Sequence, residues 1–148
     1  MIPMSQGEPV EILLAEDNPG DVKLTRKALK EGRLVNNLHV VNDGVETMAF
    51  LRNEDEYGDT PRPDLVLLDL NMPRKDGRDV LEEIKADDDL KRIPVVVLTS
   101  SDAEEDIVKS YDLHANAYLT KPVDFDGFLE TLELLEEFWL QVVRLPPE

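Results

Sequence analysis

A chain of 148 residues with 41% hydrophobic side chains has the length of a single domain and enough apolar residues for a core. The absence of cysteine excludes disulfides, thiolate catalysis and cysteine-ligated metal sites. A net charge of −17 argues against a nucleic-acid partner, whose phosphates the chain would repel. The same charge favours cations and cationic protein surfaces as partners, and it would suit an organism with a salty cytoplasm.

No stretch of the sequence predicts export or association with a membrane. Residues 1–9 are expected to form a loose leader, and they lack the basic region and long apolar core of a signal peptide. No apolar run approaches the roughly 20 residues that a membrane span needs. The lack of cysteine fits a reducing compartment. We therefore expect a cytoplasmic protein with no membrane partner.

Short apolar runs alternate with helical patterns along the whole chain. The expected strands are residues 10–15, 38–41, 65–69, 94–98 and 117–119. The expected helices cover about 19–32, 45–51, a segment around 80–84, a segment that begins at 101–102, and about 124–145. The polar, breaker-rich residues 52–63 are expected to form an exposed loop. This alternation predicts an α/β fold, in which helices cover both faces of a parallel sheet.

Polar side chains stand where the apolar strands end. Glu16 and Asp17 follow the first strand, Asp69 ends the third, and Thr99 and Lys121 follow the fourth and fifth. Parallel strands share one direction, and ligands of open α/β sheets bind outside the carboxyl ends of the strands. A solvated carboxylate at a strand exit is the ordinary alternative for Asp69 taken alone. The partner groups that reach the same edge favour a functional site.

Three carboxylates at one edge repel one another, by roughly 4 kcal/mol for a pair at 4 Å and an effective dielectric near 20. Either a raised carboxylate pKa or a bound cation must relieve this repulsion. An all-oxygen set, with His39 and His114 elsewhere in the pattern, favours a hard ion such as Mg²⁺. Lys121 and Thr99 offer a positive charge and a hydroxyl to phosphate oxygens. The groups together predict an aspartyl phosphate at Asp69, and a cation site without chemistry is the alternative.

Four motifs in this order resemble the receiver domain of two-component response regulators. They are LLAEDNP at 13–19, LLDLNMPRKDG at 67–77, VVVLTSS at 95–101 and AYLTKPV at 117–123, and the resemblance extends from residue 10 to about 138. It implies a flavodoxin-like, doubly wound, five-stranded parallel sheet of order 2-1-3-4-5 with five helices. The implied domain covers residues 10–145, followed by a short tail at 146–148 and no effector domain.

The resemblance also implies a role for each site residue. Asp69 is the phosphoacceptor, and Thr99 and Lys121 hold phosphoryl oxygens. Thr99 and Tyr118 form the switch pair, whose aromatic ring moves inward when the hydroxyl is drawn to the phosphoryl group. The peptide bond from Lys121 to Pro122 is expected to be cis. The Mg²⁺ site comprises the side chains of Asp17 and Asp69 and the backbone carbonyl of Asn71, and Glu16 supports the ion through a water molecule.

The expected function is that of a phosphorelay signalling module rather than an enzyme with an external substrate. A sensor histidine kinase would donate the phosphoryl group from a phosphohistidine to Asp69, slow autodephosphorylation would remove it, and a switched surface would bind a downstream protein target. An aspartyl-phosphate phosphatase is one alternative, although Asn71 cannot transfer protons as the second Asp of that class does. A binding module that works without phosphorylation is another. A nucleotide-binding enzyme is the weakest, because no glycine-rich loop follows a strand.

The chain departs from compact receivers at Arg74 and Lys75, in the long loop 52–63, and near its end. The last expected helix carries one broad apolar stripe, and Leu134 and Phe138 fall on the opposite flank. Apolar groups on two sides predict a homodimer or partner interface there. The long loop and the FWL segment at 138–140 also resemble stand-alone receivers that are paired with phytochrome-like sensor kinases.

Overall fold

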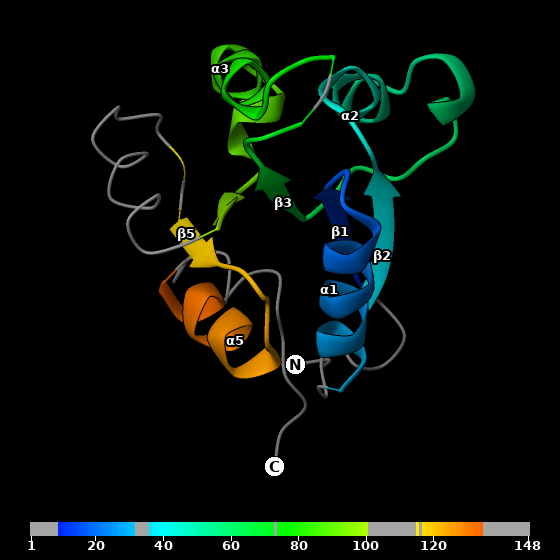
Figure 1. Ribbon diagram of the computed structural model, residues 1–148. Coiled ribbons are helices and arrows are strands. Elements are labelled where there is room, and N and C mark those ends of the chain that lie inside the picture. The colour runs from blue at the N-terminus through cyan, green and yellow to red at the C-terminus, as the bar shows by residue number, and fades with distance from the viewer. Residues whose placement is uncertain (1–8, 32–35, 73, 101–114, 116, 135–148) are drawn as a thin grey trace.

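The computed structural model describes residues 9–31, 36–72, 74–100, 115 and 117–134 (Figure 1). Its five strands form one parallel sheet of order β2-β1-β3-β4-β5, as the sequence predicted. The strands are β1 (Val10–Ala15), β2 (Asn36–Val41), β3 (Leu65–Asp69), β4 (Val95–Thr99) and β5 (Ala117–Thr120). The chain order changes direction between β1 and β3, which are neighbours in the sheet. Ligands of this fold class bind at that switch point.

The described ranges contain four α-helices: α1 (Pro19–Glu31), α2 (Gly44–Leu51), α3 (Gly77–Ala86) and α5 (Phe125–Leu134). Two 3₁₀ turns, η2 (Asp55–Tyr57) and η3 (Leu90–Arg92), complete the elements. The helix expected from residue 101 onward lies outside the described residues, as do residues 1–8 of the leader, the tail and the last helix beyond residue 134. None of the described helices is long and apolar enough to span a membrane.

Two apolar layers enclose the sheet. One lies between the sheet and helices α2 and α3, and its buried members include Leu68, Leu81 and Val97. The other lies on the opposite face, under α1 and α5, and its members include Leu14, Leu67 and Phe128. In Figure 1 these helix pairs lie on opposite sides of the sheet. Because both faces are covered, β3 and β4 are buried at every position, which explains their unbroken apolar sequences.

Two local expectations need correction. The fourth strand begins at Val95 rather than at Pro94, whose ring nitrogen has no hydrogen to donate to a ladder. The segment 52–63 is not wholly exposed, because Tyr57 packs against the core and its ring centroid lies 5.5 Å from that of Phe50. Asn53 organises this loop by donating from Nδ2 to the carbonyl oxygens of residues 57 and 60, at 3.1 and 2.9 Å.

Candidate functional site

The end of β1 delivers two of the predicted acidic residues. The backbone N–H of Glu16 donates to the Val41 carbonyl at 3.0 Å, so the ladder between β1 and β2 continues to this residue. The Glu16 side chain is buried, whereas Asp17 is exposed. Asn18 then caps α1, because its Oδ1 accepts from the N–H of Asp21 at 3.1 Å. The strand exit and the helix start therefore lie at the same edge of the sheet, as the Asn-Pro pair predicted.

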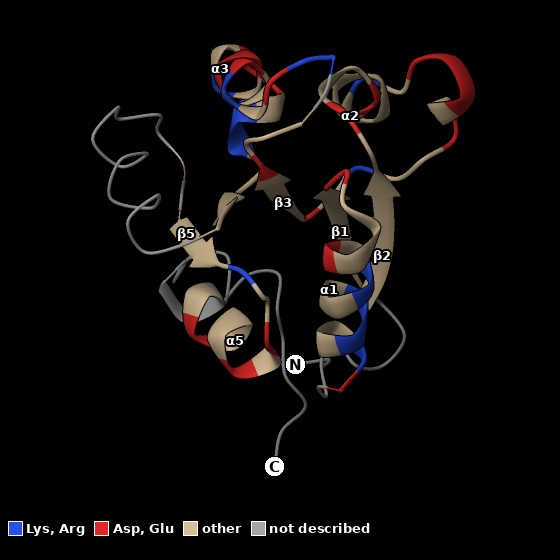
Figure 2. Cartoon of the chain, in the orientation of Figure 1, with Lys and Arg blue, Asp and Glu red and all other residues tan. Residues whose placement is uncertain are grey.

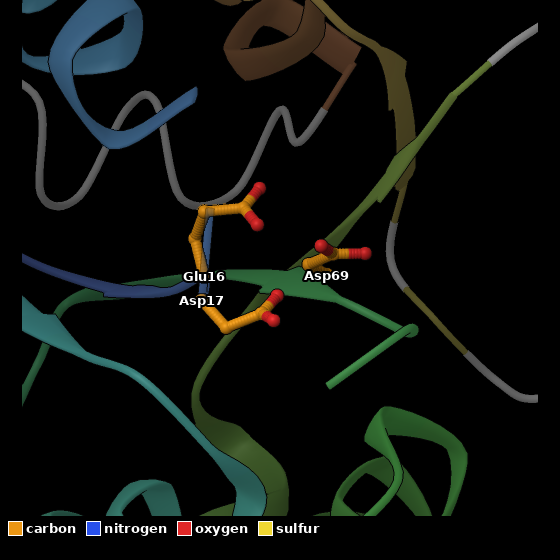
Figure 3. A group of neighbouring side chains, drawn as sticks. All are labelled: Glu16, Asp17 and Asp69. Carbon is orange, nitrogen blue, oxygen red and sulfur yellow. The ribbon is translucent and has the colours of Figure 1, made fainter. Parts of the chain in front are cut away.

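Asp69 is the last residue of β3, and its side chain is only 5% exposed. Its Oδ1 accepts a hydrogen bond from the N–H of Asn71 at 3.1 Å. The three carboxylates of Glu16, Asp17 and Asp69 each offer an oxygen, and these oxygens lie within 4.8 Å of one another. Figure 3 shows them close together at the ends of β1 and β3. The sequence-based prediction that these three groups meet is confirmed.

Lys121 follows β5 and enters this acidic group. Its Nζ lies 3.0 Å from Glu16 Oε1, 3.3 Å from Asp69 Oδ2 and 2.9 Å from Asp21 Oδ2. Burial alone would lower the pKa of the ammonium, but the hydrogen bonds to Asp21 and Glu16 and the charge of Asp69 raise it above its usual value. The lysine therefore remains charged. Figure 2 shows the acidic ends of β1 and β3 and the basic segment after β5.

One ammonium does not neutralise the whole edge. Burial, together with a hydrogen bond and charge repulsion from Asp69, raises the pKa of Glu16 to about 7, although Lys121 and the Asn18 N–H act in the opposite direction. Without a cation, Glu16 therefore carries a proton over part of the neutral range. A divalent ion would relieve the same repulsion, and an oxygen-only donor set fits a hard ion. The residues present thus fit a divalent metal site.

Thr99 ends β4 next to this group. Its side chain is fully buried, and its hydroxyl oxygen has no hydrogen-bond partner among the described residues. A buried hydroxyl without a partner costs about 1–3 kcal/mol, so stability does not account for a threonine at this position. The hydroxyl is available to an oxygen that enters the site.

The structure brings together Glu16, Asp17, Asp69, Thr99 and Lys121 at one edge, through the predicted strand ends. Asn71 follows Asp69 at the surface, and the bond between Lys121 and Pro122 is cis, as expected. Tyr118 is half-buried on β5, on the face of the sheet that also holds Val97, its partner in the ladder. Phe138 and the side chain of Leu134 lie outside the described residues, so the predicted interface there stays a prediction.

Sequence reasoning missed Asp21. This carboxylate lies in the first turn of α1 and makes the shortest of the three contacts to Lys121. Its position in the helix that begins at the sheet edge was a usable signal. The partnership with a lysine 100 residues away was not visible in the sequence.

Sequence reasoning also missed the way in which the loop after β3 is held. Arg74 has a left-handed backbone with φ of 66°, and its Nε donates to Asp43 Oδ2 at 2.8 Å. Asp43 caps α2 with its other oxygen, which accepts from the Glu46 N–H at 2.8 Å. Burial works against ionisation of Asp43, but Arg74 and the backbone N–H hold the pKa of this carboxyl below its usual value. The loop that carries Asn71 is thereby tied to the start of α2.

Comparison with known proteins gives the family. The model of the response regulator receiver domain matches residues 12–133. Response regulator Rcp1 of Synechocystis sp. is 49% identical over 138 residues, which are 93% of this chain and 94% of that protein.

Solved structures of similar proteins agree with this result. The bacteriophytochrome response regulator AtBRR has a TM-score of 0.83 at 44% identity, covering 89% of this chain and 96% of that one. The phosphorylated cyanobacterial phytochrome response regulator RcpA has a TM-score of 0.73 at 50% identity, covering 94% and 99%. The Mn²⁺-bound form of Rcp1 has a TM-score of 0.72 at 49% identity, covering 94% and 100%.

Proposed function

This chain belongs to the response regulator receiver domain family, and from that premise we propose that it is a phosphorylation-driven switch with Asp69 as phosphoacceptor. The observation that carries the proposal is the position of the Asp69 carboxylate. It lies 3.3 Å from the Lys121 ammonium and within 4.8 Å of the Glu16 and Asp17 oxygens. This proximity supports Asp69 as the nucleophile, Lys121 as the cation for the transferred oxygens, and Glu16 and Asp17 as the acidic pair of a metal site.

The proposed transfer begins with attack of an Asp69 oxygen on the phosphorus of a phosphohistidine. The new bond joins this oxygen to phosphorus, the bond between phosphorus and nitrogen breaks, and the histidine nitrogen keeps the electron pair. Autodephosphorylation is the reaction with water, which breaks the acyl phosphate and yields inorganic phosphate and the free carboxylate. Lys121 would hold one phosphoryl oxygen and the Thr99 hydroxyl another. The unpartnered state of that hydroxyl supports this role.

The proposed metal is Mg²⁺, held by the side chains of Glu16, Asp17 and Asp69 and by the backbone carbonyl of Asn71. When bound, such an ion neutralises charge on the phosphoryl oxygens. The proximity of the three carboxylates supports the site, and the raised pKa of Glu16 indicates that they lack sufficient counter-charge. The Mn²⁺-bound form of Rcp1 supports a divalent ion.

The proposed output is a population shift between two packings of the β4–β5 side of the sheet. Thr99 and Tyr118 would be coupled, because a hydroxyl drawn towards the phosphoryl group leaves space that the aromatic ring enters. The half-buried state of Tyr118 on the same face as Val97 supports this movement. A downstream protein target would then recognise the changed surface, and Leu134 and Phe138 are proposed to contribute to a homodimer or partner contact.

The proposed phosphoryl donor is a sensor histidine kinase of the phytochrome type in the cytoplasm. The names of AtBRR and RcpA, both phytochrome response regulators, support this choice. Phosphotransfer profiling of this chain against phytochrome-type and other histidine kinases of the same genome tests it. A faster transfer from a kinase of another type would contradict the assignment while leaving the phosphoacceptor role intact.

The test of phosphorylation itself is incubation with acetyl phosphate and Mg²⁺, followed by intact-mass analysis. Wild type should gain the mass of one phosphoryl group, and Asp69→Asn should gain none, because the amide is not a nucleophile of this kind. Asp64→Asn is the matched control, since Asp64 precedes β3 whereas Asp69 ends it. A folded wild type that gains no mass, or a gain that survives in Asp69→Asn, would overturn the proposal.

A further inference from the structure

The three partners of Lys121 fall into two kinds. Glu16 and Asp69 belong to the group of carboxylates that could hold a metal ion, whereas Asp21 does not. The contact from Lys121 Nζ to Asp21 Oδ2 is also the shortest of the three, at 2.9 Å. One ammonium is therefore shared between the metal ligands and a carboxylate outside them.

A divalent cation and an ammonium compete for the same oxygens. At 4 Å, two like unit charges repel by roughly 4 kcal/mol at an effective dielectric of 20, and a divalent ion doubles that value. An ion among Glu16, Asp17 and Asp69 would therefore displace Lys121 from Glu16 and Asp69. The ammonium would need another anionic partner in order to stay in the pocket.

We propose that Asp21 is the positioning residue that retains Lys121 at the site when a divalent cation occupies the neighbouring carboxylates. This inference rests on the metal site proposed above. Asp21 is well placed for the task, because its backbone N–H is bound to Asn18 Oδ1 at 3.1 Å and its side chain is 29% exposed. The backbone N–H of Lys121 donates to the Thr99 carbonyl at 2.7 Å, so both ends of the contact have fixed backbones.

The contribution of Asp21 to the position of Lys121 should depend on whether the metal is bound. In the metal-free protein, three carboxylates hold the ammonium, and loss of any one of them leaves two. In the metal-bound protein, Asp21 alone holds it. The effect of removing Asp21 on the position of Lys121 should therefore be small without the ion and large with it. A merely structural role of Asp21 in α1 would give the same effect in both conditions.

Amine acylation at limiting reagent, with the extent at Lys121 read by peptide mass spectrometry, tests this inference with and without saturating Mg²⁺. In wild type, Lys121 should react slowly in both conditions. In Asp21→Asn, Mg²⁺ should raise its labelling on the order of tenfold, the equivalent of one lost charge-assisted hydrogen bond. Asp79→Asn is the matched control, since Asp79 is likewise acidic in the first turn of a helix. Labelling of the half-buried Lys85 reports whether each variant is folded.

Titration calorimetry with Mg²⁺ distinguishes failure of the proposed metal site from failure of the proposed role of Asp21. Asp21→Asn should bind the ion several-fold more weakly than wild type, and Asp79→Asn should bind it equally well. If wild type binds no Mg²⁺, the metal site fails and the role of Asp21 fails with it. If wild type binds Mg²⁺ but the ion leaves Lys121 labelling in Asp21→Asn unchanged, or raises it equally in wild type, the role of Asp21 alone is overturned.

Discussion

The carboxylates at the two ends of the sheet differ in the partners that they contact. At the amino end, Glu11 Oε1 pairs with His39 Nε2 at 2.7 Å and Oε2 accepts from Asn37 Nδ2 at 2.9 Å. Its backbone N–H donates to Asp64 Oδ2 at 2.9 Å, and the Asp64 N–H donates to the Glu11 carbonyl at 2.7 Å. At the carboxyl end, the carboxylates of Glu16, Asp21 and Asp69 share the Lys121 ammonium, Asp17 lies beside Glu16 and Asp69, and the Thr99 hydroxyl has no described partner.

The difference separates a structural polar cluster from a binding site. At the amino end, each carboxylate has a hydrogen-bond partner, because the Asn37 amide and the His39 ring contact Glu11 and the Glu11 N–H donates to Asp64. Hydrogen bonds of this kind stabilise polar groups that are partly removed from water. At the carboxyl end, negative charge exceeds positive charge and a donor is unused, so the site is less stable alone than with a ligand. The same kinds of residues thus have different roles, and the completeness of their hydrogen bonding distinguishes them.

The largest effect is expected from crowding the carboxyl end. A Cβ on Gly77 would lie 2.6 Å from the Asp69 carbonyl oxygen and 2.5 Å from Leu70 Cα, so Gly77→Ala must displace the loop after β3. We expect a loss of about 1–3 kcal/mol in the free energy of unfolding and a severe loss of phosphorylation by acetyl phosphate. Urea unfolding and intact mass measure both. Gly58→Ala is the control, because the nearest atom to its Cβ would be 3.9 Å away.

The next largest effect is a pH dependence of the free energy of unfolding, which is caused by Glu16 at the carboxyl end of the sheet. The folded state raises the pKa of Glu16 from 4.5 to about 7, so between these values it binds a proton that the unfolded state has released. Raising the pH from about 4.5 to 7 should therefore reduce the free energy of unfolding of wild type relative to Glu16→Gln, by about 2 kcal/mol. Chemical unfolding without divalent ions measures the difference. A pH-independent difference would contradict the assigned cause.

A smaller effect with opposite signs is expected from two buried threonines. Thr99→Val removes a hydroxyl without a described partner, so it should raise the free energy of unfolding by up to about 1 kcal/mol while impairing the phosphorylation-induced change. Thr47→Val removes a hydroxyl that donates to the Asp43 carbonyl at 2.7 Å, so it should lower this free energy by about 1 kcal/mol. Denaturant midpoints compare the two. Destabilisation of equal size in both variants would show that the Thr99 hydroxyl is already satisfied.

The smallest effect is expected at the amino end. Glu11→Gln should lower the free energy of unfolding by less than about 1 kcal/mol, because the amide can keep a bond to His39 or Asn37 and the pair is partly exposed. Its Mg²⁺ affinity and its phosphorylation by acetyl phosphate should equal those of wild type. A change in either quantity would mean that the two ends of the sheet are coupled and that their contrast is incomplete.

The parallel sheet and the main residues of the site were predictable from the sequence alone. Unbroken apolar runs such as 65–68 are local signals, and polar residues at the strand ends, such as Asp69 and Lys121, must meet once the strands are parallel. The Asn18 cap of α1 was readable for the same reason, since it depends on neighbours in the chain.

The pairing of charged side chains across the edge of the sheet became visible only in the folded structure. The contact of Asp21 with Lys121 joins residues 100 positions apart, and the bond of Arg74 to Asp43 joins residues 31 apart. Such pairs depend on the order of the strands and the directions of side chains at their ends, which no local pattern encodes. The unpartnered hydroxyl of Thr99 is likewise a property of its surroundings in space. The pKa values of the site residues differ because their burial and the distances between their charges differ, and both are set only when the chain folds.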